Sequence, residues 1–102
     1  MDIHSRIKNV VENNALRTIL FNQVPNNNVV IAAIRRKGKW SRRDIKLTGY
    51  YAFVAIVCRE ARIILNETDY NVLSNASDIL WKDAPRQNYI NIAQAVNADI
   101  RQ

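Results

Sequence analysis

Apolar residues recur at three- and four-residue steps through the first twenty positions of this chain, which is the spacing of one face of an α-helix. We therefore predict an amphipathic helix over residues 3–22, built on Ile3, Ile7, Val10, Val11, Ala15, Ile19 and Leu20. Asp2 can cap its start by accepting hydrogen bonds from the first free amides. The helix should end before Pro25, because proline disfavours helical backbone at the residue before it, and residues 24–28 should form a turn.

The next apolar stretch, residues 29–37 (VVIAAIRRK), is ambiguous, because a short run rich in β-branched residues also suits a buried strand. Its far end favours a helix. Gly38 follows a turn of Lys and Arg, where a left-handed residue and cations that complement the helix dipole are common. We expect Asn28 to cap this helix. The alternative is a short hairpin around residues 29–47 within an α+β fold.

The longest predicted helix covers residues 42–65 and starts at a capping box over residues 41–44 (SRRD), in which Ser41 and Asp44 satisfy free amides. Its middle is apolar on nearly all sides, which is typical of a helix at the centre of a bundle. We expect it to bury Val54, Ile56, Val57 and Cys58. Gly49 lies inside the helix at a cost of about 1 kcal/mol relative to alanine, so a kink there or a fresh start capped by Thr48 are the alternatives.

Two more helices complete the pattern. Residues 70–82 repeat the helical spacing with Val72, Leu73, Ala76, Ile79 and Leu80. Ala84 and Pro85 suit the opening of a last helix that runs to about Ile100. The predicted fold is therefore all-α, with residues 1–102 forming one domain, a compact bundle of about five helices.

Composition supports one globular domain, since 48% of residues are hydrophobic, 24% are charged, and there are two glycines and two prolines. The longest apolar run, residues 47–58, is shorter than the roughly 20 residues of a membrane span. The first residues lack a signal-peptide pattern, and Cys58 has no second cysteine to pair with. We expect a cytoplasmic (intracellular) protein with no membrane contact. Thirteen asparagines and thirteen isoleucines suggest an AT-rich coding sequence, as in a phage or other mobile element.

The net charge of +6 is concentrated in residues 35–46 (RRKGKWSRRDIK), which hold seven of the fifteen Lys and Arg and one of the nine acids. The other ninety residues carry eight charges of each sign and are neutral overall. Such a cluster creates a local field that attracts phosphate or acidic protein surface. We call this stretch the basic segment, and its candidate binding residues are Arg35, Arg36, Lys37, Lys39, Trp40, Arg42, Arg43 and Lys46.

In the helical interpretation, the basic segment spans a helix end, a turn at Gly38 and the first turn of the next helix, which is the layout of a helix-turn-helix. Arg42, Arg43 and Lys46 would lie on one side of the second helix and reach into the DNA groove. Trp40 could stack on a base or sugar. The first hypothesis is a small, non-enzymatic nucleic-acid-binding accessory or regulatory protein, with DNA favoured over RNA.

Two other interpretations fit the same charges. The chain could be an inhibitor or adaptor that docks its basic segment on an acidic surface of a protein partner. The basic segment could also be a solvated corner of the domain with no partner, in which Trp40 covers the edge of the core.

The last predicted helix has an unusual polar face of uncharged amides, formed by Gln87, Asn88, Asn91, Gln94 and Asn97. Charged residues are depleted at the centres of protein interfaces, so Gln87, Asn91 and Gln94 form a candidate face for a homo-oligomer or another partner. The alternative is that the amides only reflect the asparagine-rich composition.

The sequence contains no pattern of a catalytic or metal site. His4 stands alone without companions at metal-ligand spacing, and no phosphate-binding glycine loop or nucleophile motif occurs. Cys58 lies in the most apolar part of the chain and is expected to act as a small buried hydrophobe. We therefore expect neither enzymatic activity nor a cofactor.

Overall fold

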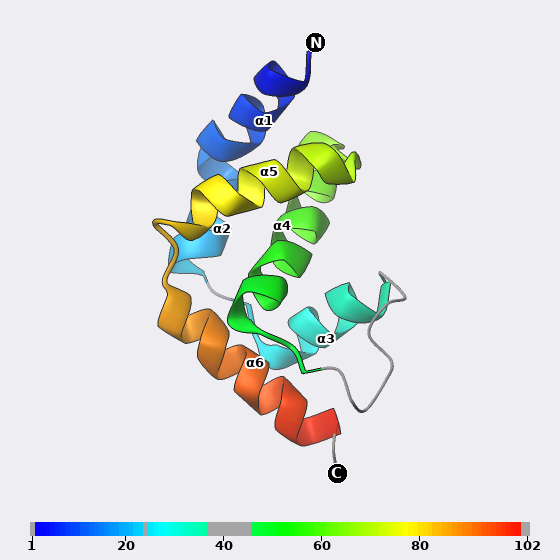
Figure 1. Cartoon of the computed structure of the whole chain (residues 1–102), viewed down its shortest axis with the longest axis vertical. Coiled ribbons are helices and arrows are strands. Elements are labelled where there is room, and N and C mark those ends of the chain that lie inside the picture. Colours follow the sequence, from blue (N-terminus) through cyan, green and yellow to red (C-terminus); the bar gives the residue numbers. More distant parts are fainter. Residues whose placement is uncertain (1, 24, 37–45, 101–102) are drawn as a thin grey trace.

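The computed structural model describes residues 2–23, 25–36 and 46–100, with backbone alone at 35, 36, 99 and 100. Within these residues all regular structure is α-helical, so the predicted all-α class is confirmed and the strand alternative for residues 29–36 is wrong. The described part of the chain holds six helices instead of five (Figure 1): α1 (Ile3–Glu12), α2 (Asn14–Asn22), α3 (Asn27–Arg36), α4 (Gly49–Leu65), α5 (Tyr70–Trp81) and α6 (Arg86–Ile100).

Helix α4 forms the centre of the molecule, as its apolar composition predicts. It packs against α2, α3, α5 and α6, while α1 packs mainly against α5 (Figure 1). Its six consecutive residues 52–57 are all buried, which only a central helix can achieve. Cys58 departs from the prediction, because it is half-buried at the edge of this core.

The single helix predicted over residues 3–22 is two helices, and Asn13 is the reason. Its side chain accepts a hydrogen bond from the Leu16 amide at 2.9 Å, so it caps the start of α2 while it also ends α1. Asparagine competes with helical backbone in this way more readily than most residues. The break leaves Val10, Leu16 and Leu20 buried in one common core.

Helix α3 begins earlier than predicted. The Asn26 side chain accepts from the Val29 amide at 3.1 Å, so Asn26 satisfies the free amides that we assigned to Asn28. The apolar face of α3 buries Val30, Ala33 and Ile34, which fixes this short helix on the core.

The prediction that the long helix starts at Arg42 is wrong, because residues 46–48 are not helical and α4 begins at Gly49. Thr48 caps it by accepting from the Tyr51 amide at 3.1 Å. Gly49 lies so close to α6 that an added Cβ would be 2.9 Å from the Ile90 nitrogen, which explains the glycine. The capping box over residues 41–44 lies outside the described part of the chain.

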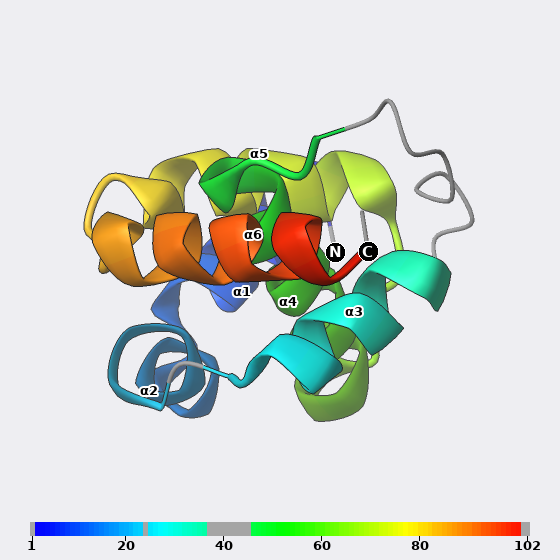
Figure 2. The ribbon, with the colours of Figure 1, turned by 90° about the horizontal axis from the view of Figure 1, so that it is seen from below.

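Helix α6 connects the other helices through the side chain of Tyr89. The Tyr89 hydroxyl of α6 donates to the Leu20 carbonyl of α2 at 2.8 Å, and its ring meets the Phe53 ring edge-on at a centroid distance of 5.0 Å. Seen from below, α6 crosses the molecule with α2 and α3 on one side and α5 on the other (Figure 2). The core therefore lies between α4 and these surrounding helices.

Candidate functional site

Of the eight candidate residues in the basic segment, the structure describes the side chain of Lys46 alone, and it is exposed. Arg35 and Arg36 form the last turn of α3, described by its backbone. The other candidates, and the expected exposure of Lys39, Arg42 and Arg43, lie outside the described residues: Lys37, Lys39, Trp40, Arg42 and Arg43.

Both flanks of the basic segment are held on the folded core. On one side is α3, whose buried face anchors it. On the other side Leu47 is 6% exposed, and its backbone is clamped by the Asn97 side chain of α6. Asn97 Oδ1 accepts from the Leu47 amide at 2.8 Å, and Asn97 Nδ2 donates to the Leu47 carbonyl at 2.9 Å. The chain therefore leaves and rejoins the core at two fixed points.

The helix-turn-helix arrangement expected around Gly38 does not exist in the form proposed. Helix α4 starts after Thr48, and its residues 52–57 are buried, so its first turns cannot enter a DNA groove. Lys46 lies before the helix, so it does not share a helical side with Arg42 and Arg43. The start of α4 therefore does not provide the recognition helix that the sequence predicts.

Charge is separated more widely than the basic segment alone suggests. Residues 13–59 hold nine Lys and Arg and one acid, whereas residues 60–83 hold five acids and two Lys and Arg. The first stretch includes α2, α3 and the first turns of α4, and the second includes α5. Along the sequence, the cations and the acids are thus concentrated in different stretches of the chain.

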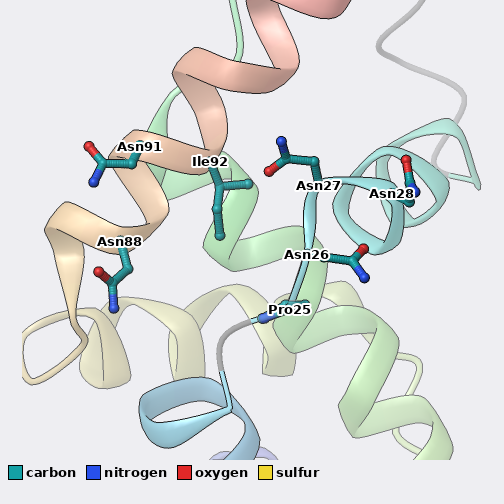
Figure 3. Close-up of a pocket in the computed structure, with 7 residues that line it drawn as sticks. All are labelled: Pro25, Asn26, Asn27, Asn28, Asn88, Asn91 and Ile92. Carbon is teal, nitrogen blue, oxygen red and sulfur yellow. The ribbon is translucent and has the colours of Figure 1, made fainter.

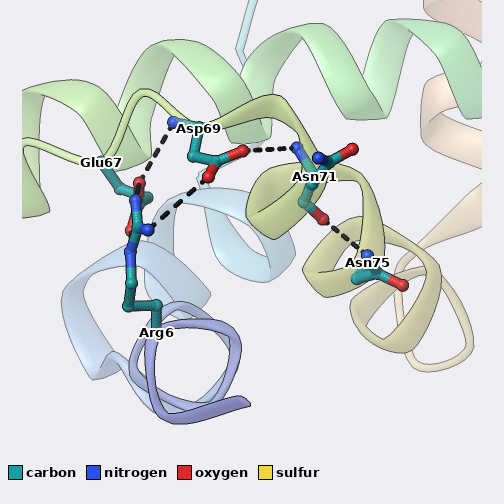
Figure 4. Close-up of polar contacts among 5 residues, drawn as sticks. All are labelled: Arg6, Glu67, Asp69, Asn71 and Asn75. Carbon is teal, nitrogen blue, oxygen red and sulfur yellow. Dashed lines mark hydrogen bonds and ion pairs between the residues drawn. The ribbon is translucent and has the colours of Figure 1, made fainter. Parts of the chain in front are cut away.

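The ion pair between Arg6 and Glu67 has a structural role (Figure 4). The Arg6 guanidinium donates to both Glu67 oxygens, at 2.9 and 2.6 Å, and lies 3.5 Å from the Asp69 carboxylate. Asp69 in turn caps α5 by accepting from the Asn71 amide at 2.9 Å. The hydrogen bond from Arg6 lowers the pKa of Glu67. This network fastens α1 to the turn between α4 and α5.

The amide face of α6 is exposed at Gln87, Asn91 and Gln94. Gln87 Nε2 donates to Asn91 Oδ1 at 2.8 Å, so part of the hydrogen-bonding capacity of this face is used within the helix itself. Asn97, which shares the amide composition, faces inward to Leu47 and is unavailable to a partner.

Beside this face lies an open groove of about 630 Å³ between α6 and the start of α3 (Figure 3). The side chain of Asn27 is directed toward Ile92 across it. Its lining is almost entirely amide and carries no charge: Pro25, Asn26, Asn27, Asn28, Asn88, Asn91 and Ile92.

A second groove, of about 310 Å³, was not anticipated from the sequence. It lies where the middle of α4 meets the last turns of α3 and the start of α5, and Arg59, Arg62 and Tyr70 are among its lining residues. The sequence signal that could have indicated it is Tyr70, a large aromatic residue at a helix start, which is 55% exposed.

Among the residues that the structure describes, the remaining titratable groups form no reactive cluster. Burial, followed by the hydrogen bond to Asp78, raises the pKa of Tyr50 to about 12, so its hydroxyl stays protonated and donates to that carboxylate. His4 is exposed. Across the described residues, no three His, Cys, Asp or Glu side chains gather in a way that could hold a metal ion. Among the same residues, no helix has the length and apolar character needed to cross a bilayer.

Comparisons with protein-family models, with curated proteins and with solved structures found no match to this chain. The functional argument therefore rests on the residues themselves.

Proposed function

We propose that this chain is a small, non-enzymatic nucleic-acid-binding protein, with DNA favoured over RNA, that acts through its basic segment. The observation that carries the proposal is the charge distribution: twelve residues contain the whole net charge of +6. Phosphate neutralisation by Lys and Arg supplies most of the affinity of sequence-independent nucleic-acid binding. Arginine outnumbers lysine four to three in the segment, which favours bidentate phosphate or guanine contacts.

The anchoring of the segment adds support. Its flanks are fixed by the buried face of α3 and by the Asn97 clamp on Leu47, so less chain entropy is lost when the cations meet a ligand. The composition supports an intracellular accessory role, and a phage or mobile element is the source that we infer from the abundance of asparagine and isoleucine.

The test is a fluorescence-anisotropy titration of the full chain on labelled duplex DNA between about 50 and 200 mM salt. If all seven cations of the basic segment meet phosphates, the slope of log K against log salt is about −6. Arg42→Gln/Arg43→Gln should make the slope shallower by about 1.8. The matched control, Lys8→Gln/Lys82→Gln, removes two exposed cations elsewhere and should leave it unchanged.

Equal losses in the two double variants, or a flat salt dependence of the original chain, would contradict the proposal. The adaptor alternative predicts a different result. The chain would not bind duplex DNA at physiological salt, and the basic-segment variant would mainly slow its association with an acidic protein partner.

A further inference from the structure

The groove between α3, α4 and α5 has an apolar floor and a polar rim. Ala33, Ala55 and Leu73 form the floor and are each at most 6% exposed. Two of these three are alanines from neighbouring helices, and their small side chains leave a hollow of about 310 Å³. A hollow of this size with an apolar floor suits one planar ring better than an extended chain.

The rim supplies an aromatic ring and a cation. Tyr70 is 55% exposed at the start of α5, so part of its ring is open to solvent. The guanidinium of Arg62 forms no ion pair or hydrogen bond among the side chains and backbone that the structure describes. An aromatic face beside an uncompensated guanidinium is the pair of features that binds a stacked base and its phosphate.

The other charges around the groove are already compensated. Arg59 is paired with Glu60, and both oxygens of Glu67 are taken by Arg6. Glu67 also accepts from the Asp69 amide at 3.1 Å. Arg62 is therefore the cation in this groove that remains available to an anionic ligand.

The groove also lies beside the end of α3, where the basic segment begins. Ala33 of its floor lies one turn before Arg36, where α3 ends and the segment continues. The ends of α3 and α5 that border the groove lie on the same side of α4 (Figure 1). A strand whose phosphates meet the segment can thus reach the groove with an adjacent nucleotide.

We infer that this groove accepts an unpaired nucleotide of a single-stranded nucleic acid, with its base stacked on Tyr70 and its phosphate at Arg62. The inference rests on the proposed function and names its ligand class. A base held in a duplex has no free face, so the groove would make the protein prefer single strands, overhangs or unpaired sites over continuous duplex. No base-edge contact is involved, so the preference for sequence is weak.

The experiment is an anisotropy titration of the full chain on a fluorescein-labelled deoxythymidine oligomer of about twelve nucleotides, with a uridine oligomer and a duplex alongside. Tyr70→Ala should weaken single-strand binding by about 5- to 150-fold, the loss of one stacked base, and leave duplex binding unchanged. Tyr70→Phe keeps the ring and should bind like the original chain. Tyr51→Ala, which removes an exposed tyrosine of α4 outside the groove lining, is the matched control.

Arg62→Gln should make the single-strand salt slope shallower by about 0.7, while Lys82→Gln should not. Unchanged single-strand binding by Tyr70→Ala, or an equal loss in Tyr51→Ala, overturns the groove assignment. If salt-dependent duplex binding survives in that case, the proposed function stands without the groove. If the original chain binds no nucleic acid of either kind, both proposals fall.

Discussion

Tyr89 shows how one buried polar atom ties together distant parts of this chain. Its ring is fully buried, and its hydroxyl donates to the Leu20 carbonyl across sixty-nine positions of sequence. Periodicity places Tyr89 on the buried face of the last helix, but no sequence signal selects Leu20 as its partner. Burial raises the pKa of the Tyr89 phenol, because the core disfavours the phenolate.

Tyr89→Phe should lower the free energy of unfolding by about 1 to 3 kcal/mol, because the buried Leu20 carbonyl loses its hydrogen bond. The exposed Tyr51→Phe should change it by less than about 0.5 kcal/mol. Urea unfolding of both variants near neutral pH measures this. The raised pKa also predicts that stability falls as the pH rises above 10.0, the ordinary tyrosine value, and this part of the fall should be absent in Tyr89→Phe. Equal stabilities for the two variants at neutral pH would contradict the assignment.

The elements that the sequence predicted best are those whose ends depend on local signals. The expected helices over 70–82 and from Pro85 to Ile100 match α5 and α6 closely, since a regular apolar period defines both and the adjacent Asp69 caps α5. The start of α4 depends instead on Asn97, fifty positions from Leu47, and on the approach of Ile90 to Gly49. Such contacts leave no mark in the local pattern, so the local pattern favours the capping box at Ser41 over a start at Thr48.

The cap of α4 can be tested directly. Thr48→Ala should lower the free energy of unfolding by about 1 kcal/mol, because the Tyr51 amide loses its acceptor. Thr48→Ser retains the oxygen and should cost much less. Thr68→Ala, at an exposed threonine that caps no helix, is the control for loss of a hydroxyl and a methyl group. Guanidinium midpoints that are the same for Thr48→Ala and Thr68→Ala would argue against the cap.

The attachment of α1 to the turn before α5 should depend on pH. The pKa of Glu67 is lowered in the folded state by the Arg6 hydrogen bond, so the unfolded state takes up protons first as the pH falls. The resulting stability is fully present above about 4.5, the ordinary carboxyl value, and is lost as the pH falls through the lowered pKa.

Thermal unfolding between about pH 6 and pH 3 tests this linkage. Glu67→Gln should be less stable than the original chain at pH 6, and the difference should shrink toward pH 3. Asp83→Asn, which replaces an exposed carboxylate, should run parallel to the original chain over the whole range. A gap between Glu67→Gln and the original chain that stays constant with pH would show that Arg6 does not hold this carboxylate in its charged form.

At the scale of the molecule, the charge distribution could be recognised from sequence, but the groove could not. The basic segment is contiguous, so counting charges finds it. The floor and rim of the groove come from three helices, with Ala33, Ala55, Arg62 and Tyr70 brought together only by the packing of α3 and α5 on α4. On the amide face of α6 the structure exposes Gln87, Asn91 and Gln94, whereas Asn97 bonds to Leu47, and the local pattern does not indicate this because Leu47 belongs to a distant loop.

Because eight of the nine acids lie outside the basic segment, removing two of them can separate the effect of direct phosphate contacts from the effect of net charge on long-range attraction. Glu12→Gln/Asp83→Asn removes two exposed acids of α1 and the turn after α5, which raises the net charge by two without adding a cation to the basic segment. If affinity comes from phosphates bound by the segment, the salt slope on duplex DNA should stay the same, because no further counterion is released. The association rate should rise modestly at low salt and return to the original value once screening reduces the field, since the Debye length is about 8 Å at physiological ionic strength. Stopped-flow association and equilibrium titration at the same salt concentrations measure the two effects. A slope that steepens by about 1.8, as two new phosphate contacts would require, would show that net charge, and not the basic segment, governs binding.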